Sequence, residues 1–151
     1  MAIGRETIYT ALFNQLSLSL SAANGGAFNT VSRRMTAASQ LTESDCPAIF
    51  LHELGERYEQ SMLGGPAKVT LMAQAYMYAM CDLESDVPAA TINNLCDNVE
   101  DAIAPIPALG VQTLGDLVQH CWLEGRMSDY IATQAGRLSI TVLELAMLVD
   151  H

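Results

Sequence analysis

The stretch from Lys68 to Cys81 constrains the fold more than any other part of the chain, because it carries no charge after its first residue. Its side chains alternate between two kinds, as in a strand whose successive residues point to opposite faces. One set is small and apolar: Val69, Leu71, Ala73, Ala75, Met77 and Ala79. The other set is larger or polar: Thr70, Met72, Gln74, Tyr76, Tyr78 and Met80. We therefore predict a long strand whose second face suits cover by a helix or by another protein chain.

Length and composition indicate a single domain that spans residues 1–151. A chain of this size can bury a core without support from a metal or a disulfide. It is 50% hydrophobic and only 16% charged, whereas an average globular domain is about 25% charged. Two explanations stay open: a fold rich in alanine, or apolar surface that is buried between subunits.

The charge balance argues against tight binding of nucleic acid. The formal net charge is -10, Lys68 is the one lysine, and the adjacent pair Arg33-Arg34 is the largest run of cations. Such a pair is too small to neutralise many phosphates. An acidic surface is nevertheless compatible with a wall past which DNA moves without sticking.

The cysteines and the N-terminal stretch indicate a soluble protein of a reducing cytoplasm. No Cys-x-x-Cys pair occurs, so the four cysteines are predicted to be reduced thiols of the core. Residues 7–32 are uncharged, but Asn14, Gln15 and several serines interrupt the apolar residues. We therefore predict neither a signal peptide nor a membrane span. The cysteines are Cys46, Cys81, Cys96 and Cys121.

Periodicity and turn residues predict an α+β fold with one mixed, mostly antiparallel sheet of about five strands and helices packed on one face. The second and third strands are expected to be antiparallel neighbours, joined through a turn at Gly64-Gly65-Pro66. Alternation in the last strand blurs after Leu143, which indicates a bulge or burial on both faces. The predicted helices cover 7–20 and 88–104, and the predicted strands cover 28–34, 48–51, 68–81, 118–124 and 138–149.

Patterns that could carry catalysis fail on geometry or spacing. His120-Cys121 is the one adjacent pair that could form an activated thiolate, but neighbours on a strand point to opposite faces. His52 has no ligand-like spacing to a partner. Residues 64–68 lack the spacing of a phosphate loop. We therefore predict no catalytic residue, no cofactor and no metal.

Acidic clusters are expected to be solvated surface. Asp82, Glu84 and Asp86 alternate like the first ligands of a calcium loop, but valine occupies the glycine position. These residues are better explained as a loop that caps the following helix. Glu53, Glu56 and Glu59 are better explained as a charged edge or an exposed hairpin arm than as an acid/base pair.

Five segments, in this order and spacing, resemble tail terminator proteins of long-tailed bacteriophages, and the resemblance spans nearly the whole chain. Its most specific part is the Thr-Leu-Gly run at 113–115 that continues to His-Cys-Trp-Leu-Glu-Gly at 120–125. The last strand departs from the pattern, because Ser-Ile-Thr-Val-Leu-Glu stands at 139–144 in place of a run like Ala-Ile-Val-Pro. Its register therefore stays open. The segments are 28–34, 45–51, 69–79, 88–95 and 113–125.

The resemblance implies a structural virion protein without catalytic residues, assembled in the host cytoplasm and placed at the neck of the virion. It implies a homohexameric ring that caps the head-proximal end of the tail tube, stops tube polymerisation and joins tail to head. The implied partners are other copies of the chain, the tail tube protein and a head-completion or connector protein. DNA would pass through the channel without specific binding, and no membrane is involved.

Candidate contact residues follow from this hypothesis. We expect loops around 56–65 and 126–136 to make the axial contacts. An outward arginine of the Arg33-Arg34 pair is expected to bind a carboxylate of the neighbouring subunit. Two alternatives stay open: another neck or head-completion adaptor, and a small cytoplasmic hydrolase that uses Cys121. The candidates are Arg33, Arg34, Glu56, Arg57, Tyr58, Tyr76, Tyr78, Arg126 and Asp129.

Overall fold

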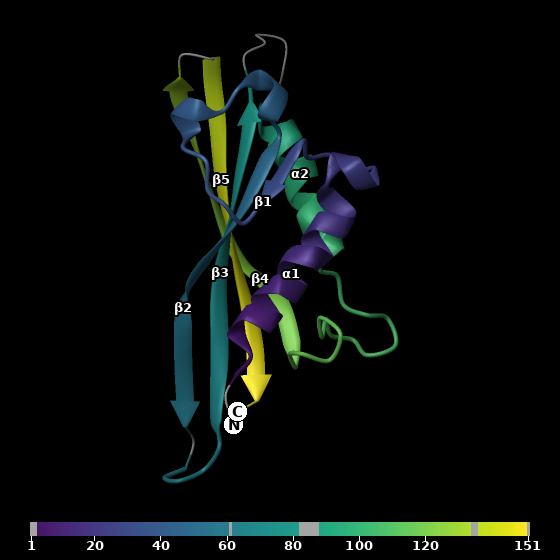
Figure 1. Ribbon diagram of the computed structural model, residues 1–151, viewed down its shortest axis with the longest axis vertical. Helices are drawn as coiled ribbons and strands as arrows, with labels where there is room; N and C mark the ends of the chain where they lie inside the picture. The colour runs from purple at the N-terminus through teal and green to yellow at the C-terminus, as the bar shows by residue number, and fades with distance from the viewer. Residues whose placement is uncertain (1–2, 61, 82–87, 134–135, 151) are drawn as a thin grey trace.

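The predicted long strand lies at the centre of a five-stranded sheet in the computed structural model, which describes residues 3–60, 62–81, 88–133 and 136–150 (Figure 1). Two helices lie on one side of this sheet. The strand order is β1-β2-β3-β5-β4. The elements are α1 (Arg5–Leu20), β1 (Thr30–Ser32), β2 (Ala48–Gln60), β3 (Ala67–Met80), α2 (Pro88–Ala102), β4 (His120–Thr133) and β5 (Gly136–Asp150), with 3₁₀ turns at Ala22–Asn24, Ala38–Gln40 and Glu43–Asp45.

The sheet topology confirms the predicted fold class. β1 pairs with β2 in parallel, and every other pair is antiparallel. β2 and β3 are antiparallel neighbours, as the turn at 64–66 predicted. Because β1 is short and pairs only with Ala48 to Phe50, the rest of β2 forms one free edge of the sheet. β4 forms the other edge.

The two faces of β3 differ as the alternation predicted. The small apolar residues from Val69 to Ala79 are all buried in one core with the inward side chains of α1 and α2. We call this side the helix face. Ala73 and Ala75 are fully buried, and their small size lets the helices pack close to the sheet. The opposite side, which carries Gln74 and Tyr76, is called the open face.

Both predicted helices are present, and each buries one apolar stripe against the sheet. In α2, the buried stripe includes Ile92, Leu95, Cys96 and Val99, and Ile103 just after the helix is buried as well. In α1, the buried residues are Ile8, Tyr9, Leu12, Leu16 and Leu20. The chain then turns sharply at Gly26, where a Cβ atom would lie 2.3 Å from the backbone carbon of Leu20. Only glycine fits this close approach without a shift of the backbone.

Three predicted strand boundaries were wrong. The first strand is Thr30–Ser32 rather than 28–34. β2 continues to Gln60 instead of ending at residue 51, and β4 runs from His120 to Thr133 instead of 118–124. The extra parts of β2 and β4 are mostly exposed, so they lack the apolar alternation by which a half-buried strand is found.

Each long edge strand contains a β-bulge, and the two bulges flank the same row of the sheet. The register shifts between Glu53 and Gly55 in β2 and between Leu123 and Gly125 in β4. Both shifts lie beside the row in which Ala73 pairs with Leu145. Bulges bend a strand and increase its twist, and Figure 1 shows the strands crossing strongly at mid-length.

The register of β5 explains its blurred alternation. β5 pairs with β3 without a shift from Leu138 to Asp150. Leu145, Ala146 and Met147 are all buried, so the strand is covered on both faces at this point. Of the two explanations offered for the blurred alternation, burial on both faces applies to β5, and the bulge lies in the neighbouring strand β4.

In the described part of the chain, no helix is long and apolar enough to cross a membrane.

Candidate functional site: a hairpin arm and an open sheet face

Beyond the β2 bulge, β2 and β3 form a hairpin arm, which we define as residues 55–60 and 62–72; β5 pairs with its β3 half as far as Lys68. The arm projects past the helices at one end of the molecule (Figure 1). Gly64 takes a positive φ of 76° in the turn at its tip. Met62 and Leu63, next to this turn, are 71% and 105% exposed. Of the segment 56–65, predicted as a loop, residues 56–60 are strand and 62–65 form the turn, while residue 61 lies outside the described residues.

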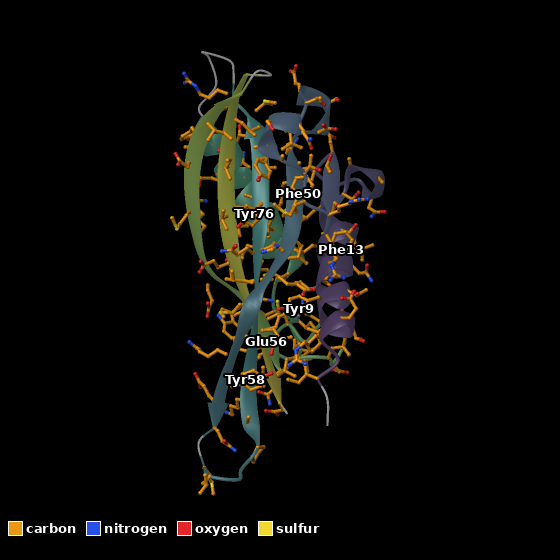
Figure 2. The ribbon with its side chains drawn as sticks, turned by 60° about the vertical axis from the view of Figure 1, so that its left-hand side comes forward. Tyr9, Phe13, Phe50, Glu56, Tyr58 and Tyr76 are labelled. Atoms are coloured by element: carbon orange, nitrogen blue, oxygen red, sulfur yellow. The ribbon has the colours of Figure 1, made fainter. Side chains whose placement is uncertain are left out.

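An ion pair with a tyrosine fastens the arm to the start of α1. Glu56 and Tyr58 share rows with Leu71 and Val69, so their side chains point to the helix face and meet Arg5. The Arg5 guanidinium pairs with both oxygens of Glu56 and donates to the Tyr58 hydroxyl at 2.6 Å. Arg5 lowers the pKa of Glu56, and the Tyr58 hydroxyl, which donates to Glu56 Oε2 at 2.7 Å, lowers it further. We call these three residues the arm clasp; Figure 2 shows Glu56 and Tyr58 on the arm.

Tyr9 adds a second anchor at the root of the arm. Its hydroxyl donates to the backbone carbonyl of Met72 at 3.1 Å, next to the row where the β2 bulge interrupts the regular register. Burial raises the pKa of Tyr9 to about 12, and the nearby carboxylates of Glu53 and Glu56 raise it in the same direction. The arm is thus held against α1 at two levels.

Arg33 forms ion pairs within its own chain. Its guanidinium donates to both oxygens of Glu6, at 2.6 and 3.1 Å, and to Glu53 at 2.7 Å. Arg33 lowers the pKa of Glu6 through this pair. Arg34 is exposed, and in the described part of the chain no ion pair involves its side chain. Of the two, Arg34 is the one available to a neighbouring subunit.

One end of the open face is covered by the segment with the 3₁₀ turns at 38–45. Leu41 and Cys46 from this segment pack on Phe50 and Tyr78, which meet edge to face with ring centroids 5.8 Å apart. Tyr78 is only 6% exposed. The prediction that Tyr78 lies at an interface is therefore wrong for this subunit, because its own chain covers the ring.

The middle of the open face is not covered. Here Tyr76, Met127, Val142 and Glu144 line a shallow hollow of about 310 Å³. The Tyr76 hydroxyl donates to Gln74 Oε1 at 2.8 Å, which fixes the ring against the sheet. Met127 is 76% exposed beside it. Tyr76 thus lies on a face that no helix of its own chain covers at this point, so of the two predicted kinds of cover only another protein chain stays open here.

The other candidates lie on strands rather than loops. Of the predicted loop at 126–136, residues 126–133 belong to β4 and Gly136 begins β5, while 134–135 lie outside the described residues. Arg126 donates to Asn93 Oδ1 of α2 at 2.7 Å, and Asp129 is exposed in the row of Ile140. Arg57 Nε lies 3.3 Å from Glu59 Oε1. Both side chains are about two-thirds exposed, so this ion pair contributes little to the stability of the fold.

The His120-Cys121 pair is split across the sheet, as predicted. Cys121 pairs with Met147 on the helix face and is fully buried, whereas His120 stacks on Trp122 with centroids 5.3 Å apart. Burial raises the pKa of Cys121 to about 12, so its thiol is protonated at neutral pH. Cys46, Cys96 and Cys121 are buried thiols, and the Cys81 thiol donates to the Arg137 carbonyl at 3.4 Å.

Among the described residues, no group of three or more His, Cys, Asp and Glu side chains could hold a metal ion. The acidic cluster at 82–86 lies outside the described residues.

A groove runs between the end of α2 and the start of β4. It has a volume of about 330 Å³, an apolar lining that includes Ile103, Trp122 and Leu123, and an acidic rim of Glu100 and Asp101. We call it the α2–β4 groove.

Sequence reasoning missed Arg5, Met62, Leu63 and Trp122. For the tip, a signal existed: Met62-Leu63 is an apolar pair directly before Gly-Gly-Pro, where a turn normally carries polar residues. Arg5 had no such signal, because its partner lies 51 positions away.

Comparison of the sequence with models of protein families and with characterised proteins gives no match.

Proposed function

We propose that this chain is a structural subunit whose copies form a ring at the head-proximal end of a phage tail tube, where the ring stops tube polymerisation and joins tail to head. The main observation in support of this proposal is that the helices cover one face of the sheet and leave the middle of the other face uncovered. The helix face is sealed by α1 and α2, whereas the middle of the open face leaves Tyr76, Val142 and Met127 accessible. Uncovered apolar surface of this kind is typical of protein–protein contacts.

The subunit also offers unlike surfaces at different places, which a ring requires. A closed ring is built by head-to-tail contacts, in which one patch of each copy meets a different patch of the next. The hairpin arm extends from one end of the sheet, and the β4–β5 hairpin lies at the other end (Figure 1). A subunit that binds the last tube ring on one side, with no copy of that surface on the other, would end polymerisation.

The charge of the chain agrees with passage of DNA. The net charge is -10, and four of the arginines contact groups of their own chain: Arg5, Arg33, Arg57 and Arg126. Phosphates would find few free cations along such a wall, so DNA would move without being trapped. The proposed partners are further copies, the tail tube protein and a head-completion or connector protein, in the neck of the virion.

A different neck or head-completion adaptor is the second candidate, since it would use the same exposed surfaces. The two candidates differ in the partner that they bind. We expect substoichiometric amounts of this protein to arrest growth of tail tubes of the same phage, measured by light scattering and by tube length. Unchanged tube growth together with binding to the head connector would favour the adaptor instead. Tyr76→Asp, which adds a charge on the uncovered face, should weaken the arrest, whereas Thr7→Asp on an exposed site of α1 should not.

A further inference from the structure

The tip of the hairpin arm presents apolar side chains to solvent. Met62 and Leu63 are neighbours, are 71% and 105% exposed, and belong to neither cluster of buried residues. Single exposed apolar side chains are common on proteins. Two adjacent ones at the end of a projecting arm form a compact knob that a partner could cover.

The arm is held in place before any partner binds. The arm clasp joins Glu56 and Tyr58 to Arg5, and Tyr9 fastens Met72 at the root. Binding by a preformed element costs less conformational entropy than binding by a disordered one. These contacts set the position of the root and middle of the arm, from which the knob projects, relative to the body of the subunit.

The same chain carries a receptor surface of matching character. The α2–β4 groove has an apolar lining that includes Ile103 and Leu123, and it is rimmed by Glu100 and Asp101. Figure 1 places α2 beside the body of the sheet and the arm tip at the projecting end, so a copy does not fill its own groove.

Charge favours the arm as the occupant of this groove. The arm and the residues beside it carry three cations, Arg5, Arg57 and Lys68, the one lysine of the chain, and three carboxylates, Glu56, Glu59 and Asp150. The formal charges of this part of the surface sum to zero, whereas the whole chain has a net charge of -10. Most of the surface of another copy would therefore be repelled by the carboxylates of Glu100 and Asp101 at the rim of the groove. The arm end can approach it and supply a cation.

We infer that the knob of Met62 and Leu63 in one copy docks into the α2–β4 groove of the next copy. The inference rests on the proposed ring and names the contact that closes it. Knob and groove are different surfaces of one chain, so the contact is head-to-tail, and repetition around an axis gives a ring rather than a two-fold dimer.

Cross-linking between copies tests this contact. One preparation carries Leu63→Cys, and the other carries Ala104→Cys at an exposed position of the groove. After the two are mixed and treated with oxidised glutathione, we expect a disulfide-linked dimer on a non-reducing gel. Each variant alone controls for the native thiols and should give far less dimer. A mixture that gives no more dimer than the single variants would overturn the inference.

A matched pair of substitutions tests the energetics. Leu63→Asp should weaken assembly at least about tenfold, since a hot-spot side chain would be replaced by a charge. Leu18→Asp changes a leucine of α1 that is 68% exposed and should leave assembly unchanged. Sedimentation velocity measures assembly, and circular dichroism verifies that both variants are folded. Equal assembly of the two variants would overturn the inference.

A charge exchange adds a rescue. Lys68→Glu should weaken assembly, and addition of Glu100→Lys in the same chain should restore it at least in part. Failure of the contact and failure of the proposed function are distinguishable. If the Leu63→Asp protein still formed rings and arrested tube growth, the knob–groove contact would be ruled out and the proposed function would stand. If the cross-linked protein formed rings that did not affect tube growth, the proposed function would be ruled out and the contact would stand.

Discussion

Substitution of two leucines of β5, one on each face of the sheet, tests whether only the helix face is buried in the free subunit. Leu145 is 1% exposed on the helix face, whereas Leu148 is partly exposed in the row of Thr70 on the open face. A buried Leu→Ala change costs about 2–5 kcal/mol through lost transfer free energy and the cavity left behind. The same change at a partly exposed site removes less buried area and should cost about 1 kcal/mol or less. We therefore expect Leu145→Ala to lower the free energy of unfolding far more than Leu148→Ala.

Thermal unfolding followed by circular dichroism measures this difference. In a chain of this size, a loss of about 3 kcal/mol lowers Tm by about 6–12 °C. The measurement must be made at protein concentrations where free subunits dominate, because assembly stabilises the folded state. If Leu148→Ala lowered Tm as much as Leu145→Ala under these conditions, the open face would be covered within the free subunit, and the reasoning would fail.

Three further predictions follow from individual side chains. Leu95→Asp should abolish soluble expression, because it puts a charge on the buried stripe of α2 at a site that is 5% exposed; soluble yield at wild-type level would contradict this. Cys121→Ser should leave ring assembly intact, and the native thiol should react with a thiol probe near pH 7 only after unfolding. Because folding raises the pKa of Cys121 from 9.0 to about 12, its contribution to stability is full below pH 9 and is lost as pH rises through 12; a Cys121→Ala variant should lack this part of the pH dependence in urea titrations. Arg34→Glu should weaken assembly without a change in Tm, whereas Arg33→Glu should lower Tm by placing a carboxylate beside Glu6 and Glu53; equal Tm values for the two variants would show that the pairs of Arg33 do not stabilise the subunit.

The parts of the fold that sequence could predict are those whose side chains face a core. β3 and α2 could be predicted because their apolar residues repeat with the period of the element and are buried in one cluster. The arm half of β2 could not, because residues 52–60 meet solvent and need no apolar alternation. In that half, strand structure is held by pairing with β3 and by Arg5, which lies 51 positions from Glu56.

The same distinction explains the candidate site. Tyr76 and Tyr78 share one face of β3 and could not be separated by sequence pattern. Tyr78 is covered because Leu41 and Cys46, from a segment without regular strand or long helix, fold over it. Alternation predicted that one arginine of the Arg33-Arg34 pair points outward, but it could not predict that α1 brings Glu6 to Arg33 across 27 positions. Such long-range pairs depend on topology, which local spacing does not encode.

The ring at the end of a tail tube is the central claim, and electron microscopy of purified protein mixed with tail tubes of the same phage tests it most directly. We predict closed rings of this protein at one end only of each tube, the end that faces the head. The double variant Leu63→Asp with Tyr76→Asp, which changes both proposed contact surfaces, should leave that end bare. Tubes that carry no added density at either end, or protein bound along their sides, would contradict the account.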